Sequence, residues 1–437
     1  MLPSPADPES DGPPLTKESA FLGVLGVSAV NLRNMPLTQA REISCAARLE
    51  NVRYAIRDLA CVADEVAKQG HKILPLNIGD PLNFDFATPP HMIEAVYKAM
   101  RDGKNGYSPS SGIKPALDAI RREAARKGIT TIQDVFVTSG VSETVDICLA
   151  ALLNPGDNLL TPCPDYPLYS AVLAKLDIGL NAYYLNEEDG WQPDLDDIKR
   201  KITPRTRGIV LINPNNPTGS VCTRAMLEQI AELARRHNLV IFADEIYDKL
   251  IMDDDVPHIA LAAVAPDVPI ITFGGLSKNY LAPGWRIGWG IASGDSAALK
   301  PYIEGVNKLL RARLCANHPE QYAIPAALDG PQDHLPEVKR KLRSRRDLTM
   351  QWCHDTPRVS CVSPRGAFYA YPKIDIPEGD DIFVKELIQQ KYVMVVHGSG
   401  FGQRPGTKHF RIVFLPDEPT LSSAYFAIGS FMRERYR

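Results

Sequence analysis

The sequence predicts an α/β fold in which helices cover both faces of a mostly parallel sheet. Three observations predict it. Short apolar runs alternate with helical patterns between about residues 135 and 292, and each run leads into a polar or glycine-rich turn. The chain has 437 residues, of which 44% are hydrophobic, so it can bury a large core. Beyond about residue 300 the alternation stops, which predicts a second, smaller α+β domain.

The first part of the chain predicts helices on either side of a strand and a turn. The stretch AARLENVRYAIRDLACVADEVAKQGHK has apolar residues at three- and four-residue steps and ends near Gly70. ILPLNIGDPLNF then reads as a strand that enters a turn at Gly79, Asp80 and Pro81. Residues 90–126 predict two helices around the polar loop NGYSPSSG at 105–112.

The middle of the chain predicts the sheet. Strands are expected at 135–138, 158–161, 208–213, 239–243, 269–273 and 287–292. One helix is expected to end near residue 153, and another to span 223–237. Polar residues follow four of these strands, namely Ser139 to Ser142, Asn216, Asp244 and Lys278. In parallel sheets ligands bind beyond the carboxyl ends of the strands, so this sequence predicts a ligand site there.

The last third predicts a long helix at 336–352 with Val338, Leu342, Leu348 and Trp352 as its inner stripe. Its basic run KRKLRSRR, at 339–346, is interpreted as a solvated helix face. Strand-like pieces follow in SCVSPRGAFYAYPKI, VMVVHGSGF and HFRIVFLP. We expect a domain of residues 91–318, and a smaller one built from residues 46–90, which also cover the site, and from residues 319–437.

Charge and cysteine usage argue against several classes of protein. A net charge of −3 gives no electrostatic case for a nucleic-acid or membrane partner. The eight cysteines contain no CxxC pair, which favours reduced thiols in a cytoplasmic enzyme over a metal site or a disulfide scaffold. Residues 1–45 are acidic and proline-rich, so we expect a disordered extension, with an organelle address as the weaker alternative.

The stretch FGGLSKNYLAPGWRIGWG, at 273–290, holds the residues best suited to chemistry. A desolvated lysine such as Lys278 can form a Schiff base, and Arg286 suits a phosphate held near that amine. Asp244 ends an apolar strand, where its charge needs a facing cation such as a pyridinium. A P-loop nucleotidase also has a strand ending in Asp-Glu, but the required GxxxxGK[ST] string is absent from the sequence.

Five motifs in order, FGGLSKNYLAPGWRIGW, INPNNPTG, FADEIYDK, VTSGVSE and HFRIV, resemble the class I aminotransferases of pyridoxal-phosphate fold type I over about residues 46–437. This resemblance implies a central sheet of the seven-stranded type and a homodimer with shared active sites. LENVRYAIRD, LNIGDPLNF, ITPRTRGIV and RLCANHPEQ resemble the alanine (glutamate–pyruvate) branch. The alanine branch also has glycine at the position of Gly275, whereas aspartate aminotransferases have a phosphate-binding serine there. The glycine leaves a gap among the phosphate contacts, which Ser142 or Thr272 could fill.

The resemblance implies a role for each matching residue toward pyridoxal 5′-phosphate and substrate. Lys278 would form the Schiff base and transfer the Cα proton, and Asp244 would pair with the pyridine nitrogen. The remaining cofactor contacts would come from Asn216 and Tyr247 at the ring O3′, Tyr166 stacked on the ring, Ser277, Arg286, Gly140, Val141 and Ser142 at the phosphate, and Tyr107 across a dimer interface. Arg411 would bind the substrate carboxylate, beside Gly79 and Asn216.

Alanine and glutamate must share one site, so a second cation should reach the γ-carboxylate of glutamate. Arg57 is the candidate, with Tyr54 as a further substrate contact in the same segment. The alternatives are an aminotransferase for aspartate or aromatic acids, a C–S lyase, a decarboxylase, or a regulatory protein that uses the module as a ligand sensor. The last is disfavoured, because 45 proline-rich residues cannot form a winged helix and an intact Lys278 and Asp244 favour catalysis.

Overall fold

The computed structural model describes residues 43–52 and 59–436. Residues Ala46–Arg437 form one compact unit, and Met1–Cys45 count as a separate unit. The subdivision of residues 46–437 at positions 90 and 318 stays a prediction. Within the part of the chain that is described, no helix is both long and apolar enough to cross a membrane.

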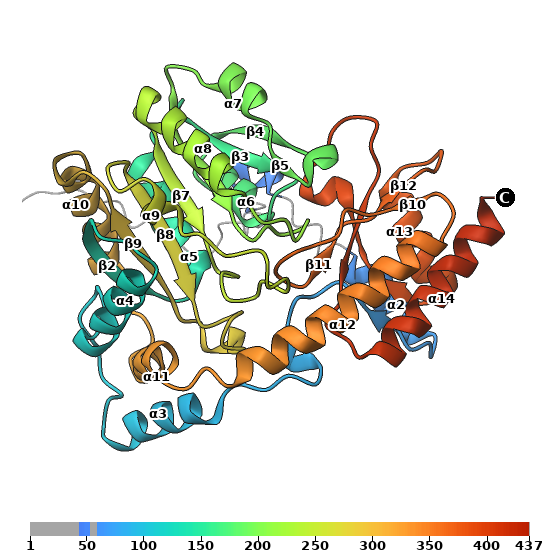
Figure 1. The fold of residues 1–437 in the computed structure, drawn as a ribbon, viewed down its shortest axis with the longest axis horizontal. Coiled ribbons are helices and arrows are strands. Elements are labelled where there is room, and N and C mark those ends of the chain that lie inside the picture. The colour runs from blue at the N-terminus through green and yellow to red at the C-terminus, as the bar shows by residue number, and fades with distance from the viewer. Residues whose placement is uncertain (1–42, 53–58, 437) are drawn as a thin grey trace, which may run out of the picture. The chain divides into compact units, whose positions relative to one another are not determined.

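A mixed, mostly parallel sheet lies at the centre of this unit, as the sequence predicts (Figure 1). Its strand order is β2-β9-β8-β7-β6-β3-β4-β5. β3, β4, β6, β7 and β8 run parallel to one another, whereas β9 is antiparallel to both β2 and β8. A two-residue strand, β5, pairs with β4 and extends a seven-stranded sheet to eight strands. The bounds are β2 Ile132–Thr138, β3 Asn158–Cys163, β4 Gly179–Asn186, β5 Gln192–Pro193, β6 Thr206–Ile212, β7 Val240–Asp244, β8 Ile270–Gly275 and β9 Gly288–Ser293.

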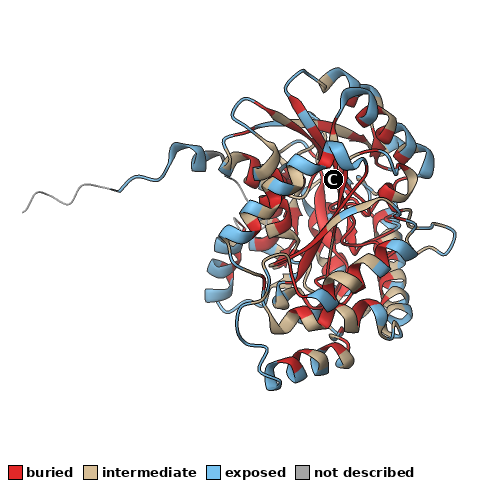
Figure 2. Cartoon of the chain, turned by 90° about the vertical axis from the view of Figure 1, so that its left-hand side faces the viewer, coloured by how far each residue is buried: buried red, intermediate tan, exposed pale blue. Residues whose placement is uncertain are grey.

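Helices cover both faces of the sheet because its strands are apolar on both faces. In β7, Ile241 and Ala243 belong to one apolar cluster and Phe242 belongs to the other. The Phe242 side packs against α5 (Val141–Leu152), α6 (Leu168–Lys175) and α10 (Ser296–Ala312). The opposite side packs against α4 (Lys114–Arg126) and α8 (Arg224–His237). Figure 2 shows the buried strands in red beneath helices whose outer faces are exposed.

Local sequence explains where several of these helices begin and end. The side chain of Thr223 accepts a hydrogen bond from the backbone N–H of Met226 and caps α8, and Asp295 caps α10 in the same way. Asn238 ends α8 in the left-handed conformation that asparagine tolerates. The other helices of this part are α3 (Pro90–Arg101), α7 (Leu195–Lys201), α9 (Leu261–Val264) and α11 (Ala323–Asp329), with short 3₁₀ turns at Pro81–Asn83, Glu187–Asp189, Pro283–Trp285 and Pro319–Tyr322.

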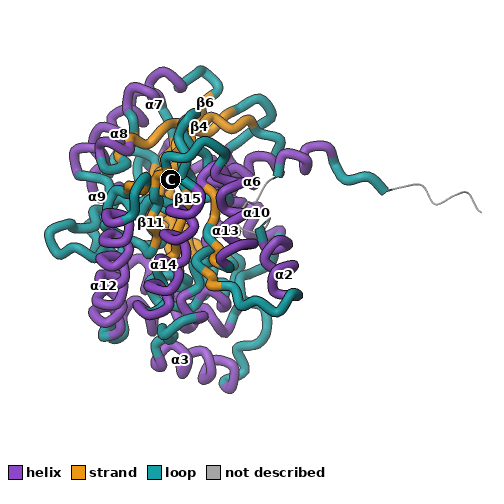
Figure 3. The backbone as a smooth tube through the Cα atoms, turned by 90° about the vertical axis from the view of Figure 1, so that its right-hand side faces the viewer, coloured by secondary structure: helices purple, strands orange, loops and turns teal. Residues whose placement is uncertain are grey.

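The C-terminal third joins the N-terminal segment through small sheets. β1 (Leu74–Pro75) pairs in parallel with β13 (Val393–Met394), and β11 (Tyr369–Ala370), β15 (Phe410–Val413) and β14 (Val396–His397) form a three-stranded sheet. β10 (Val359–Ser360) pairs with β12 (Lys373–Ile374). Figure 3 shows α12 (His334–Asp355), α13 (Asp380–Lys391) and α14 (Glu418–Arg435) around β11 and β15. Two further elements are α2 (Ala60–Lys68) and the 3₁₀ turn Ala47–Asn51.

The interpretation of the basic run in α12 as a solvated face is wrong for two of its residues. Arg345 is 1% exposed and Arg346 is 8% exposed. Arg345 NH2 contacts both carboxylate oxygens of Asp85 at 2.7 and 2.8 Å, and Arg346 NH1 lies 2.5 Å from Asp253 Oδ1. A buried guanidinium is tolerated when a carboxylate faces it, and these partners lie far away in the sequence. The predicted inner stripe is correct for Val338 and Leu342, whereas Leu348 and Trp352 are only half-buried.

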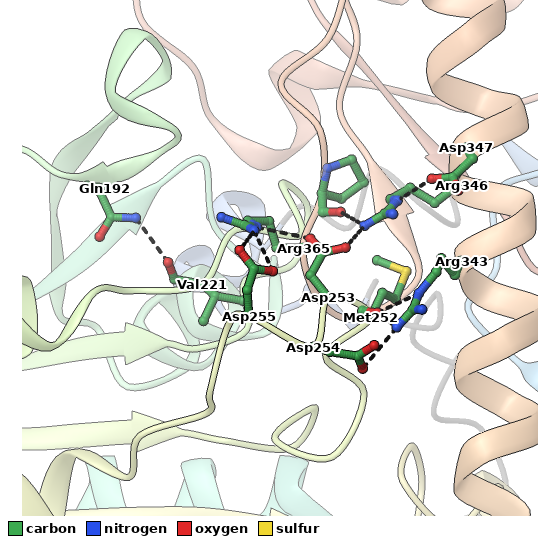
Figure 4. A network of polar contacts seen from close by, with 11 residues as sticks. Gln192, Val221, Met252, Asp253, Asp254, Asp255, Arg343, Arg346, Asp347 and Arg365 are labelled. Carbon is green, nitrogen blue, oxygen red and sulfur yellow. Dashed lines mark hydrogen bonds and ion pairs between the residues drawn. The ribbon is translucent and has the colours of Figure 1, made fainter.

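Asp253 lies at the centre of a network that joins the segment after β7 to α12 (Figure 4). Its second oxygen accepts from Arg365 Nε at 3.0 Å, and Arg365 NH2 also contacts Asp255 at 3.0 Å. Arg343 donates to the backbone oxygen of Met252. Burial alone would raise the pKa of Asp253, but hydrogen bonds from Arg346 and Arg365 lower it below its usual range. The carboxylate is therefore ionised and holds the two parts of the chain together.

Candidate active site

The candidate site lies at the edge of the sheet where β6, β7 and β8 end. Because β9 runs antiparallel to its neighbours, its first residue, Gly288, lies at this same edge. A cavity of about 400 Å³ opens there. Eleven of the residues predicted from the sequence line it, namely Gly79, Val141, Ser142, Tyr166, Asn216, Asp244, Tyr247, Ser277, Lys278, Arg286 and Arg411.

The amine of Lys278 faces the N-terminal segment across this cavity. Lys278 Nζ donates a 2.8 Å hydrogen bond to the backbone oxygen of Gly79. Burial lowers the pKa of Lys278 to about 8, with the charges of Arg411 and Arg286 acting in the same direction and Asp80 opposing them. At pH 7 about a tenth of this amine is therefore unprotonated and nucleophilic, far more than for an exposed lysine.

Asp244, the last residue of β7, presents a buried carboxylate to the same cavity. It is 4% exposed, and its Oδ2 accepts a 2.8 Å hydrogen bond from the hydroxyl of Tyr169. The Ile246 backbone N–H lies 3.4 Å from the other oxygen, Oδ1. Burial raises the pKa of Asp244 to about 6. Among the described residues none forms an ion pair with this carboxylate, so a cationic ligand group beside it would stabilise the charge.

The start of α5 and Arg286 form an anion cradle at one end of the cavity. Gly140 has a positive φ of 84°, and a Cβ atom at this position would lie 2.5 Å from the Arg286 guanidinium. A Cβ atom on Gly288 would lie 2.5 Å from the backbone N of Val141. Two glycines therefore let the guanidinium and the neighbouring strand approach the N-terminus of α5. Free N–H groups and the helix dipole at such a terminus favour phosphate.

Gly275 lacks the hydroxyl that a serine would add to this cradle. A Cβ atom at Gly275 would lie 2.9 Å from the backbone oxygen of Ile287, so a serine cannot enter without moving the neighbouring strand. Thr272 is buried in the middle of β8 and does not line the cavity. Ser142 does line it, at the second position of α5. Of the two candidates, Ser142 alone is placed to contact a ligand.

Arg411, on β15, lies at the other end of the cavity. Its NH1 donates to Asn216 Oδ1 at 3.0 Å, and its NH2 donates to the backbone oxygen of Asn77. The rings of Tyr369 and Phe401 each lie 4.7 Å from the guanidinium. These contacts fix the orientation of the Arg411 fork, which suits bidentate recognition of a carboxylate.

Tyr369 connects Arg411 to Tyr247. The hydroxyl groups of Tyr247 and Tyr369 lie 2.9 Å apart. A Cβ atom at Gly79 would lie 2.4 Å from the Tyr369 hydroxyl, so the N-terminal segment can approach this ring only because residue 79 is a glycine. Asn77 and Tyr369 line the cavity but were not predicted from the sequence. Nothing in the local sequence distinguishes either of them from a packing residue.

Of the predicted site residues that the structure describes, Tyr107 and Gly140 do not line this cavity. Tyr107 is 82% exposed and lines a separate surface cavity with Asn105 and His318. Gly140 contributes through its contact with Arg286. Tyr54 and Arg57 lie outside the described residues. The roles of these four residues, like those of the residues that line the cavity, remain predictions.

Comparisons with known proteins agree with this geometry. The sequence profile described as "Aminotransferase class I and II" matches residues 71–425. The chain is 44% identical over 397 residues to the Escherichia coli K12 protein named "Glutamate-pyruvate aminotransferase AlaA", covering 88% of this chain and 97% of that protein. It is 41% identical over 404 residues to the Mycobacterium bovis protein named "Alanine aminotransferase", covering 90% of this chain and 93% of that protein.

Solved structures show the same similarity. An alanine aminotransferase from Pyrococcus furiosus superposes with a TM-score of 0.87 at 41% identity, covering 90% of this chain and 100% of that one. A tyrosine aminotransferase from Leishmania infantum superposes with a TM-score of 0.82 at 25% identity, covering 90% and 99%. The α/β fold predicted from the sequence is confirmed by both.

Proposed function

Because this chain belongs to the class I and II aminotransferase family, we propose that it is an alanine aminotransferase that moves an amino group between L-alanine and 2-oxoglutarate, giving pyruvate and L-glutamate. The names of the relatives at 41–44% identity support alanine as the amino donor. The observation that carries the proposal is that Lys278, Asp244 and Arg411 line one cavity of about 400 Å³.

The residues present fit pyridoxal 5′-phosphate as the cofactor. The cradle of α5, Ser277 and Arg286 would hold the phosphate, and the buried carboxylate of Asp244 would face the pyridine nitrogen as its counter-charge. Asn216 and Tyr247 would donate to the ring hydroxyl, and Tyr166 would stack on the ring. When bound, the cofactor supplies an aldehyde for amine exchange and a ring that accepts electrons.

Lys278 would act as the general base and acid. Its amine would be bonded to the cofactor aldehyde when substrate is absent. It would be released from the cofactor when the substrate amine replaces it. With a pKa of about 8, the free amine can accept the proton from the substrate Cα and later return it. The hydrogen bond to Gly79 O holds the free amine of Lys278 within the cavity.

Arg411 would hold the substrate α-carboxylate through its two terminal nitrogens. Both nitrogens already have fixed partners in Asn216 and Asn77, so the fork does not have to be ordered when substrate binds. Two alternating substrates at one site would give ping-pong kinetics.

We propose that Arg57 binds the γ-carboxylate of glutamate, with Tyr54 close to the substrate. The support is chemical. Glutamate and 2-oxoglutarate carry a second carboxylate that alanine and pyruvate lack, and the same site must accept it. Arg57→Ala should raise the KM for glutamate far more than the KM for alanine. An equal rise for both substrates would contradict this role.

We also propose a homodimer that shares its active sites. The helix α3 exposes Ile93, Tyr97 and Met100, which are 49%, 52% and 44% exposed, and Tyr107 follows it in the chain. Such apolar side chains on one helix are typical of a surface that a second copy covers.

The eight cysteines are all unpaired, which supports a reducing compartment such as the cytoplasm.

A substrate panel tests the proposed activity. Alanine, aspartate, phenylalanine and valine are each assayed with 2-oxoglutarate, and we expect alanine to react fastest. Faster turnover of aspartate or phenylalanine would favour the related aminotransferases instead. Release of ammonia and pyruvate from a β-substituted amino acid, without amino transfer, would indicate a C–S lyase. A wild-type protein without turnover that still binds amino acids would indicate a sensor.

A further inference from the structure

Tyr169 lies directly behind Asp244 and outside the cavity. It is the second residue of α6, its side chain is 0% exposed, and it does not line the cavity. Its hydroxyl donates the 2.8 Å hydrogen bond to Asp244 Oδ2. Tyr169 therefore contacts the functional carboxylate from the side that faces the protein interior.

The ring of Tyr169 is packed among apolar side chains. Tyr169 belongs to the buried cluster that includes Phe242 and Phe273 from the central strands. In such an environment a hydrogen bond to an ionised group is stronger than in water, and losing it leaves the charge poorly compensated. The other titratable groups that face this pair are Glu245 and Tyr247 beside Asp244, and Asp165 and Tyr166 beside Tyr169.

We propose that Tyr169 is a positioning residue, whose hydroxyl keeps the Asp244 carboxylate ionised and aimed at the cavity and so sets how tightly the pyridine ring is held. This inference rests on the proposed function, since it assumes that the ring belongs to pyridoxal phosphate. It concerns a residue that no motif in the sequence singled out.

The expected direction follows from the forces on Asp244. Burial raises its pKa to about 6, and the hydrogen bond from Tyr169 opposes that rise. Without the hydroxyl the pKa rises further, so the carboxylate becomes protonated at a higher pH and loses its attraction for a pyridinium. The variant Tyr169→Phe should therefore bind cofactor more weakly, and the defect should grow as the pH falls.

Tyr183 offers a matched control. It is also 0% exposed, and its hydroxyl donates a 2.8 Å hydrogen bond to the backbone oxygen of Val210. Tyr183→Phe removes a buried hydroxyl of the same kind, but one that does not contact Asp244. A loss of stability common to both variants can thus be separated from an effect on the carboxylate.

The test measures the dissociation constant of pyridoxal phosphate from the purified holoenzyme, through the loss of cofactor absorbance on dilution at several pH values. For Tyr169→Phe we expect at most about a twofold increase over wild type at pH 8 and about a tenfold increase at pH 6. Lys278 titrates in both proteins alike, so the ratio reports on Asp244. Tyr183→Phe should stay within twofold at both pH values.

Two further variants keep the inference falsifiable if Tyr169→Phe folds poorly. A ring-fluorinated tyrosine at position 169 is a stronger donor of nearly the same size, and it should shift the pH dependence toward lower pH. In an Asp244→Asn background, Tyr169→Phe should change the dissociation constant less than twofold. A pH-independent ratio, or an equal effect in that background, would overturn the role of Tyr169. A wild-type protein that fails to bind pyridoxal phosphate would instead overturn the proposed function.

Discussion

Gly288→Ala should weaken cofactor binding by moving the start of α5. The added Cβ would lie 2.5 Å from both the backbone C of Gly140 and the backbone N of Val141. Ordinary contacts begin near 3.4 Å, so the strand and the helix must separate by about 0.9 Å. Backbone atoms cannot swing away as a flexible side chain can, so the whole cradle has to widen.

The expected loss of cofactor affinity follows from the hydrogen bonds that the cradle would make to a phosphate. A separation of about 0.9 Å exceeds the tolerance of a hydrogen bond, so at least one N–H bond to a phosphate would be lost. A hydrogen bond to a charged group contributes about 1.5–3 kcal/mol, which corresponds to about a tenfold to hundredfold weaker dissociation constant. The overpacked protein should also lose about 1–3 kcal/mol of stability.

The assay pairs a titration of pyridoxal phosphate with thermal unfolding of the unloaded protein. Gly305→Ala serves as the control. Gly305 lies inside α10, and a Cβ there would meet its nearest atom, Ala151 Cβ, at 3.8 Å. Alanine should be neutral or stabilising there. If Gly288→Ala bound the cofactor within twofold of wild type, the inferred phosphate cradle would be wrong.

Three other outcomes are expected. The rate at which Lys278 attaches covalently to pyridoxal phosphate should rise with pH and level off above about pH 8, where its amine is unprotonated; stopped-flow absorbance checks this, and a flat profile would contradict the lowered pKa. Asp248→Asn should lower the free energy of unfolding by about 2 kcal/mol at pH 7, since it removes the ion pair between the buried Asp248 and the partly exposed Lys127. The pKa of Asp248 is lowered to about 2, so wild type keeps this stabilisation above about pH 4 and loses it toward pH 2, and denaturant titrations of both proteins should converge there. Arg411→Lys should raise the KM for alanine at least tenfold, because a point charge cannot replace the fork; unchanged steady-state kinetics would exclude the assigned role.

The sequence was most informative where a strand ends in a polar residue. Asp244 and Lys278 follow apolar runs in one dimension, and the geometry of a parallel sheet is enough to bring such residues to one edge. For the same reason six of the eight central strands and the helix α8 were predicted close to their observed bounds, whereas β4 and β5 were not predicted. Local periodicity and known sheet geometry contain this information.

Partners that meet only through tertiary contacts could not be predicted. Arg345 and Asp85 are 260 residues apart, so a basic run that looks solvated contains a buried arginine paired with a distant carboxylate. Tyr169 and Asp244 are separated by 75 residues and come from different layers of the fold. Their hydrogen bond depends on how α6 packs on the sheet, which hydrophobic periodicity does not determine.

The parallel pair of β1 and β13 has a consequence for how the protein is made. Leu74 pairs with Val393, which follows 319 positions later in the chain (393 − 74), and the Leu76 carbonyl accepts from the N–H of Val413. During synthesis the segment that carries Gly79 must wait without its strand partner until almost the whole chain has left the ribosome. Sheet strands from β3 to β8 can pair much earlier, so a nascent chain would form its central scaffold first and complete the substrate site last.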